Sequence, residues 1–169
     1  MNQLALPSKS ELVQQLRQGG ADALNLLRAL DPAAFEEGRY ENGWNGRQIL
    51  AHLASIEWTY QRLIDVARGA SAPQEQKPQA EGRSPSGGVG DYNTRQVEKR
   101  AGASVAELLS ELEENRAATI AAVEAADESL FSVPIRSAGG AQGPLAAVLN
   151  YVAVQHVAMH VNDIAQPRV

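Results

Sequence analysis

The side chains of this chain best suited to chemistry are its three histidines, His52, His156 and His160. His156 and His160 are four residues apart, and on a helix this spacing places both imidazoles on one side, about one turn apart. Two imidazoles arranged in this way can bind one divalent transition metal ion. The HxxxH spacing alone is a weak indication, because helical proteins also contain it by chance.

The third histidine strengthens the metal interpretation. His52 is flanked by Ile49 and Ile56 at helical spacing, so its side chain is expected to face the core. A buried imidazole is costly unless its ring nitrogens find partners. A metal ion would satisfy one nitrogen of each ring, whereas an ordinary core histidine would hydrogen-bond to a carbonyl. These residues alone leave both interpretations open.

Three neutral imidazoles leave at least one position at a metal ion open. Catalytic metal sites have such an open position, whereas structural zinc sites are closed by four ligands. Nitrogen ligands suit zinc, nickel, copper or iron. Since the chain has no cysteine, disulfides, thiolate metal sites and a cysteine nucleophile are excluded. The sequence therefore predicts an open site for one divalent ion, with His52, His156 and His160 as its ligands.

Long helices are predicted to position these histidines. The first is expected over residues 8–30, where Ser8 and Glu11 have the spacing of a capping box. The second, which carries His52, is expected from Asn45 as its N-cap to Gly69 as the residue after its end.

The middle of the chain is predicted to cross over between helices. Residues 71–90 are rich in Pro, Gly, Ser, Gln and Glu, which is typical of a long flexible crossover loop. A short helix over 91–100 and a long helix over 104–127 follow. The segment 131–143 is expected to be irregular, with a short strand or none.

The last helix is expected to begin with Pro144 as its first helical residue. Two of its faces are apolar, and such a helix needs two partners, either neighbouring helices or a second subunit. One face holds Leu145, Val148, Leu149, Val152, His156, Met159 and Asp163, and the other holds Val154, Val157, Val161 and Ile164.

The fold class that follows is all-α: a four-helix bundle with a long crossover between helices 2 and 3. Residues 1–169 are expected to form a single domain, because 44% apolar and 21% charged residues are typical of a globular chain. The net charge of −5 and the scattered basic residues argue against a nucleic-acid partner. No apolar run reaches the roughly 18 residues of a membrane span, and no signal peptide is recognisable, so a cytoplasmic protein is expected.

Two segments of the chain resemble the DinB-like (YfiT-like) superfamily of metal-binding four-helix bundles. Residues 43–54, GWNGRQILAHLA, resemble the start of its second helix, and residues 151–160, YVAVQHVAMH, resemble its last helix. The resemblance implies one metal ligand from the second helix and two from the last, which here are His52, His156 and His160. It also implies zinc or nickel as the ion, and a homodimer.

Some members of that superfamily are transferases or isomerases that use low-molecular-weight bacterial thiols such as bacillithiol or mycothiol. A metal-dependent enzyme with a small molecule as its partner is therefore expected: the resemblance implies a thiol S-transferase, and a hydrolase fits equally, because a bound ion can activate water or a thiol. The mycothiol-dependent maleylpyruvate isomerase branch tends to carry Glu in place of one histidine, which argues against that narrow activity here. Two alternatives are a non-catalytic stress protein that sequesters a metal or ligand, and a purely structural bundle.

No catalytic residue beyond the ligands is predicted. Gln48, Ser55 and Gln155 lie one turn from a histidine or next to one and could contact it, although simple solvent exposure explains them equally well. Glu57 is expected as a solvated helix residue rather than as a general base. Trp44 is expected as a packing anchor rather than as a wall of the site.

Overall fold

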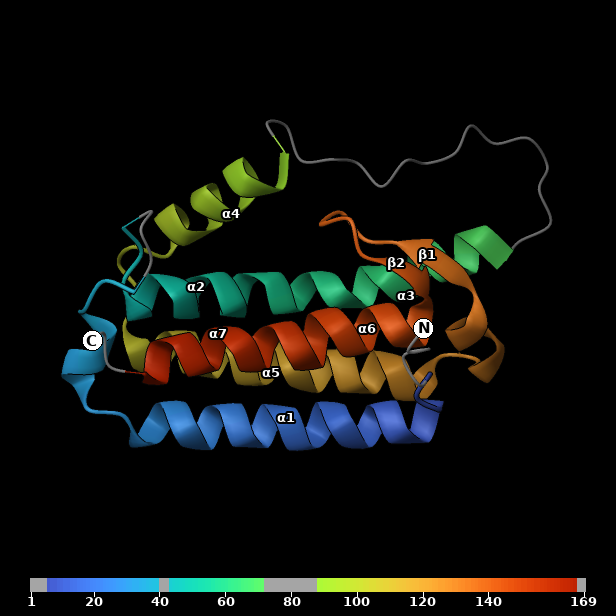
Figure 1. The fold of residues 1–169 in the computed structure, drawn as a ribbon, viewed down its shortest axis with the longest axis horizontal. Coiled ribbons are helices and arrows are strands. Elements are labelled where there is room, and N and C mark those ends of the chain that lie inside the picture. The colour runs from blue at the N-terminus through green and yellow to red at the C-terminus, as the bar shows by residue number, and fades with distance from the viewer. Residues whose placement is uncertain (1–5, 40–42, 72–87, 167–169) are drawn as a thin grey trace.

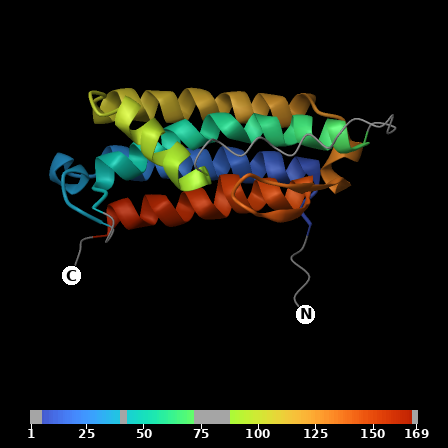
Figure 2. The same ribbon diagram turned by 90° about the horizontal axis from the view of Figure 1, so that it is seen from above.

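Four long helical segments lie side by side in the computed structural model, which describes residues 6–39, 43–71 and 88–166 (Figure 1). Helix α1 contacts α5 and α7, and α2 contacts the same two helices, so the four segments enclose one core. Helix α4 crosses the outer side of α2 (Figure 2). The helices are α1 (Lys9–Ala29), α2 (Gly46–Glu57), α3 (Gln61–Ser71), α4 (Gly88–Lys99), α5 (Val105–Ala125), α6 (Leu145–Leu149) and α7 (His156–Ala165).

Two of the long segments are built from more than one helix. A 3-10 turn, Trp58–Tyr60, joins α2 to α3, and a π-turn, Asn150–Gln155, joins α6 to α7. The predicted all-α four-helix bundle with its crossover after the second helical segment is confirmed. Within the described ranges, no helix is both long enough and apolar enough to span a membrane. Fully buried core side chains include Leu12, Leu16, Leu27, Ile49, Leu50, Leu53, Leu108, Leu145 and Leu149.

In the described part of the chain, three helices begin at a capping box, one of which, Ser8–Glu11, was expected from its spacing. In each box, the N-cap side chain accepts a hydrogen bond from the third helical residue, whose own side chain accepts one from the N-cap backbone. These bonds satisfy backbone N–H groups that the first turn otherwise leaves without partners. The three pairs are Ser8–Glu11, Asn45–Gln48 and Ser104–Glu107.

The predicted crossover loop over 71–90 is too long at both ends. Helix α3 continues past Gly69 to Ser71, and α4 already begins at Gly88, three residues before the short helix expected over 91–100. The remainder of that loop, 72–87, lies outside the described residues.

The connection before the last helix contains more structure than expected. A 3-10 turn, Glu128–Ser132, leads into strand β1 (Pro134–Arg136), which pairs antiparallel with β2 (Gln142–Pro144). Pro144 is thus the last residue of β2 and the N-cap of α6, not its first helical residue.

The inward face of the last helix differs from the predicted one. Met159 was expected to face the core but is 52% exposed, and Asp163 is only half-buried. The buried side chains are instead Ala153, Val157 and Val161.

The π-turn explains this change of face. Leu149, Ala153, Val157 and Val161 follow one another at four-residue steps, and in an α-helix each such step rotates the side chain by about 40°. Three steps would carry Val161 about 120° away from the direction of Leu149. The wider π-turn between them takes up this rotation and keeps all four side chains in the core.

The second apolar face of the last helix is covered within this chain. Val157, Val161 and Ile164 are buried, and α7 packs against both α1 and α2. Of the two partners considered for this face, the neighbouring helices are therefore the ones observed.

Replacing one or the other of the two adjacent glycines of α1 by alanine is expected to change the stability in opposite directions. A Cβ at Gly20 would lie 2.9 Å from Cγ of the buried Arg116, whereas a Cβ at Gly19 would meet only Val154, at 3.9 Å. We expect Gly19→Ala to stabilise the protein by about 1 kcal/mol through helix propensity. We expect Gly20→Ala to destabilise it by about 1–3 kcal/mol through overpacking. Urea unfolding measures both, and equal effects of the two variants would contradict this account.

Candidate metal centre

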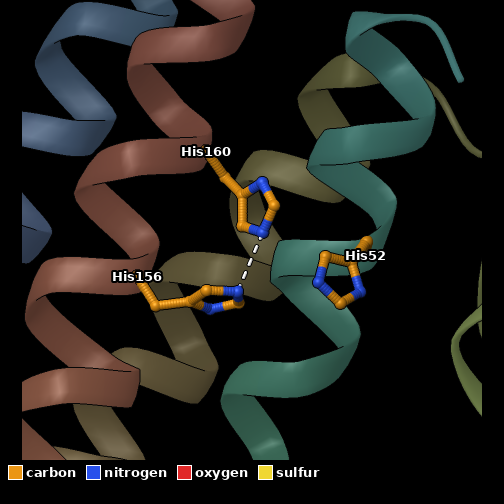
Figure 3. A group of neighbouring side chains, drawn as sticks. All are labelled: His52, His156 and His160. Carbon is orange, nitrogen blue, oxygen red and sulfur yellow. Dashed lines mark hydrogen bonds between the residues drawn. The ribbon is translucent and has the colours of Figure 1, made fainter. Parts of the chain in front are cut away.

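His52 projects from α2 toward α7, and His156 and His160 project from α7 toward α2 (Figure 3). One ring nitrogen from each imidazole lies within 4.8 Å of the others. The Nε2 atoms of His156 and His160 are 2.9 Å apart. The structure therefore brings together all three histidines that the sequence singled out.

The spacing of these nitrogens suits a single ion. Two nitrogens that each lie about 2.1 Å from zinc at a tetrahedral angle are about 3.4 Å apart. The Nε2 atoms of His156 and His160 are 2.9 Å apart and all three nitrogens lie within 4.8 Å of one another, which is compatible with this value. In the part of the chain that the structure describes, no other trio of His, Cys, Asp or Glu side chains converges in this way.

The surroundings keep the three imidazoles neutral. Burial and, to a lesser extent, the neighbouring His160 and His156 together lower the pKa of His52 to about 3. Burial and His156 lower the pKa of His160 to about 4, and burial also lowers the pKa of His156. Since a metal ion binds the neutral imidazole, all three rings are in the binding form at pH 7.

One ring nitrogen distinguishes the two interpretations of His52. Its Nδ1 is buried and has no hydrogen-bond partner among the described residues. A buried polar atom without a partner costs about 1–3 kcal/mol. The arrangement expected of an ordinary core histidine, with its ring bonded to a carbonyl, is therefore not seen at this nitrogen. The donor set and the unpartnered atom both fit a metal site.

Local structure fixes the position of His52. The Asn45–Gln48 capping box sets the start of α2, and Ser55 Oγ donates a 2.8 Å hydrogen bond to the His52 carbonyl. The Trp44 ring lies beside the imidazole, with ring centroids 5.6 Å apart. Trp44 thus anchors the start of the helix and also forms one side of the histidine site.

Two polar residues near the histidines have other partners. The side chain of Gln48 is engaged in the capping box. Gln155 is exposed and donates to Asn150 Oδ1 at 2.7 Å. Ser55 contacts the backbone of His52 rather than its ring.

The expectation of a solvated Glu57 is wrong. Its side chain is fully buried and lies 2.7 Å from Nε of Arg116, which reaches into the core from α5. Burial raises the pKa of the Glu57 carboxyl, and the Arg116 guanidinium opposes that rise. Glu57 is the partner of a buried cation, which the polar sequence around Arg116 concealed.

Asp163 is a further residue of the site. Its Oδ2 lies 3.8 Å from Nδ1 of His160, on the side of the ring opposite the Nε2 that faces His156. A carboxylate behind a metal-binding histidine commonly orients the ring and raises its basicity. The signal in the sequence was the three-residue spacing from His160, which on a helix brings the two side chains together.

The buried histidines predict an acid-sensitive apoprotein. In the unfolded chain His52 has its ordinary pKa of about 6.5. Between that pH and about 3, the unfolded state is protonated at His52 and the folded state is not. Stability is thus full above pH 6.5 and falls as the pH drops toward 3. We expect His52 to contribute a loss of about 2 kcal/mol between pH 7 and pH 5.

Urea unfolding in excess chelator, compared between wild type and His52→Leu, measures this loss. Equal pH dependence in the two proteins would contradict the assignment to His52.

A family model described as the DinB superfamily matches residues 15–164. No curated protein matches the chain.

Two solved structures are similar to it. One is the mycothiol-dependent maleylpyruvate isomerase, at 19% identity and a TM-score of 0.70, covering 94% of this chain and 61% of that one. The other is a histidine-to-alanine mutant of that enzyme, at 18% identity and a TM-score of 0.71, covering 96% and 63%. The chain spans less than two thirds of their length, and at such identities the likeness shows the fold alone.

Proposed function

Because this chain belongs to the DinB superfamily, we propose that it is a metal-dependent enzyme whose single divalent ion is held by His52, His156 and His160. The observation that carries the proposal is the convergence of all three histidines of the chain, from two helices, with a buried His52 nitrogen left without a partner. Nitrogen donors favour zinc or nickel over magnesium or calcium.

A divalent ion in this site supplies a positive charge that lowers the pKa of a bound water or thiol. The chain's own residues perform the remaining tasks. The three imidazoles are neutral and available as ligands at pH 7, and Asp163 is placed to orient His160. Trp44 gives the side next to His52 an apolar surface. Three ligands leave room for a further group, as in catalytic sites.

The proposed small-molecule partner is a low-molecular-weight thiol. Both similar solved structures are of a mycothiol-dependent enzyme. The proposed reaction is S-transfer: the thiol loses its proton to solvent, its sulfur forms a bond to an electrophilic carbon of a second substrate, and the leaving group departs from that carbon with the electron pair of the broken bond. Hydrolysis, with water in place of the thiol, is the second reaction that an open three-histidine site supports.

The test combines metal analysis with a substrate screen. Wild-type protein loaded with Zn²⁺ or Ni²⁺ is mixed with a thiol and a panel of electrophilic or ester substrates. We expect turnover that requires the metal and is lost in His52→Ala. Stoichiometric binding without product would favour the sequestering protein instead. Absence of bound metal and of any thermal shift on adding Zn²⁺ or Ni²⁺ would favour a purely structural bundle.

We also propose a cytoplasmic homodimer. A chain without cysteine suits a reducing compartment. Exposed Tyr151 and Met159 lie on the last helical segment and offer apolar surface for a second subunit. Light scattering of the metal-loaded protein tests the oligomeric state.

A further inference from the structure

We propose that Arg116 is a positioning residue for the histidine site. It holds the carbonyl of Ala153 inside the π-turn, and the π-turn directs His156 and His160 toward His52. This inference rests on the proposed metal site but concerns a residue in another part of the core.

The residue that directly follows the π-turn, His156, is one of the proposed metal ligands. The backbone N–H of His156 donates to the carbonyl of Tyr151, five residues earlier, instead of four as in an α-helix. Such wide turns are rare and occur mostly as single turns inserted into an α-helix. The direction of the His156 side chain therefore depends directly on whether this turn is kept.

Arg116 is a buried side chain that hydrogen-bonds to the π-turn. Its Nη2 donates a 2.6 Å hydrogen bond to the carbonyl of Ala153, three residues before His156. Its Nη1 donates to the carbonyl of Leu16 in α1, at 3.3 Å. With only 6% of its side chain exposed, Arg116 thus links the π-turn to α1 and to its own helix, α5.

Glu57 holds the guanidinium in this place. Its Oε1 lies 2.7 Å from Arg116 Nε, and its Oε2 accepts a 3.2 Å hydrogen bond from Nη2. Glu57 ends α2, the helix that carries His52. The helix that carries His52 is therefore connected, through the buried side chains of Glu57 and Arg116, to the π-turn that precedes His156 and His160. Gly20 leaves the space that Arg116 occupies, since a Cβ there would lie 2.9 Å from its Cγ.

Loss of the π-turn would rotate the two histidines. Each α-helical residue advances by about 100° around the helix axis, and a residue in a wider turn advances by less. If Asn150–Gln155 became α-helical while Leu145 and Leu149 stayed in the core, His156 and His160 would turn about the axis and away from His52. The buried cation that binds Ala153 opposes this change.

The experiment replaces the ion pair by apolar side chains of similar size. The double variant Glu57→Leu/Arg116→Met leaves no buried charge unpaired, so we expect it to fold. Its affinity for Co²⁺ is expected to fall at least about tenfold, and the visible spectrum of the Co²⁺ complex is expected to change, because that spectrum reports ligand geometry. The matched control is Arg100→Met, which removes a cation paired with Glu111 between α4 and α5.

We expect the control to keep the wild-type affinity and spectrum. A double variant with the affinity and spectrum of wild type would overturn the inference while leaving the metal site intact. If wild-type protein binds no Co²⁺, the proposed function fails, and a crystal structure of the metal-free double variant decides the inference. A π-turn retained over Asn150–Gln155, with His156 and His160 still directed at His52, would overturn it.

Discussion

Replacing His52 by alanine is expected to weaken the binding of Zn²⁺ or Ni²⁺ more than about 100-fold. Loss of a partner that merely orients a metal ligand costs about 10–100-fold, and loss of a ligand costs more. His156 and His160 would remain as a two-ligand pair on α7, and His52 is the one contribution from α2.

The measurement is the gain in unfolding free energy on adding metal. At about 1,000 times the wild-type Kd, a bound ion stabilises the wild-type fold by about 4 kcal/mol. A protein that binds 100-fold more weakly gains about 1.4 kcal/mol under the same conditions. Because His52→Ala also changes core packing, each protein is compared with itself in excess chelator.

Ser55→Ala is the matched control for that experiment. It removes a hydroxyl that bonds to the His52 carbonyl but retains all three imidazoles. We expect it to keep most of the metal-dependent gain. A full gain in His52→Ala would show that His52 is not a ligand.

The second large effect concerns the buried ion pair. Arg116→Met is expected to destabilise the metal-free protein by about 3–5 kcal/mol, because it leaves the Glu57 carboxyl buried without its cation. Glu57→Leu is expected to cost a similar amount. The double variant Glu57→Leu/Arg116→Met is expected to recover most of the loss, since apolar side chains can replace a buried pair at little cost. Urea unfolding of the four proteins gives the coupling energy directly.

The pH dependence of Arg116→Met provides a second check. Burial raises the pKa of Glu57, and without Arg116 nothing on that side opposes the rise. Above pH 4.5 the unfolded chain releases a proton that the folded variant retains, so the variant loses stability as the pH rises from 5 to 8. Additive single effects, or a loss that shrinks with rising pH, would contradict the pairing.

The helix starts and the histidines were accessible from the sequence because both depend on local spacing. Ser8 and Asn45 each precede a residue that can complete a capping box, and these contacts form within one turn. His52 lies in phase with Ile49, and His156 with His160, so helical periodicity alone directs them inward. These features need no knowledge of how the helices pack.

The π-turn was not accessible in this way. Nothing in Asn150–Gln155 marks a wide turn, which depends on contacts made by a neighbouring helix. An α-helical phase therefore placed Met159 on the inner face, where the structure leaves it exposed. The histidines were still found, because they follow the turn together and keep their four-residue spacing.

The positions of Arg116 and Glu57 in the helical pattern indicate burial, but their charged side chains favour exposure to solvent. Arg116 lies four residues after Leu112, and Glu57 lies four residues after Leu53, so each continues a buried stripe. Charged side chains are almost never fully buried unless they are paired, and this rule favoured solvation for each residue considered alone. Opposite charges in phase with the core on two neighbouring helices are the pattern that would have identified the pair.

The proposed ligands are distant along the chain. About 100 residues separate His52 from His156, so an ion bound by both would close a loop of that length. A disulfide over such a loop would persist in the unfolded chain and raise its free energy by about 4.7 kcal/mol, whereas an ion that binds only the folded protein stabilises it according to the free ion concentration. The stability of this chain, which has no cysteine, would thus depend on the concentration of free metal rather than on a permanent link. Its lifetime against proteases would then follow the supply of metal in the cell.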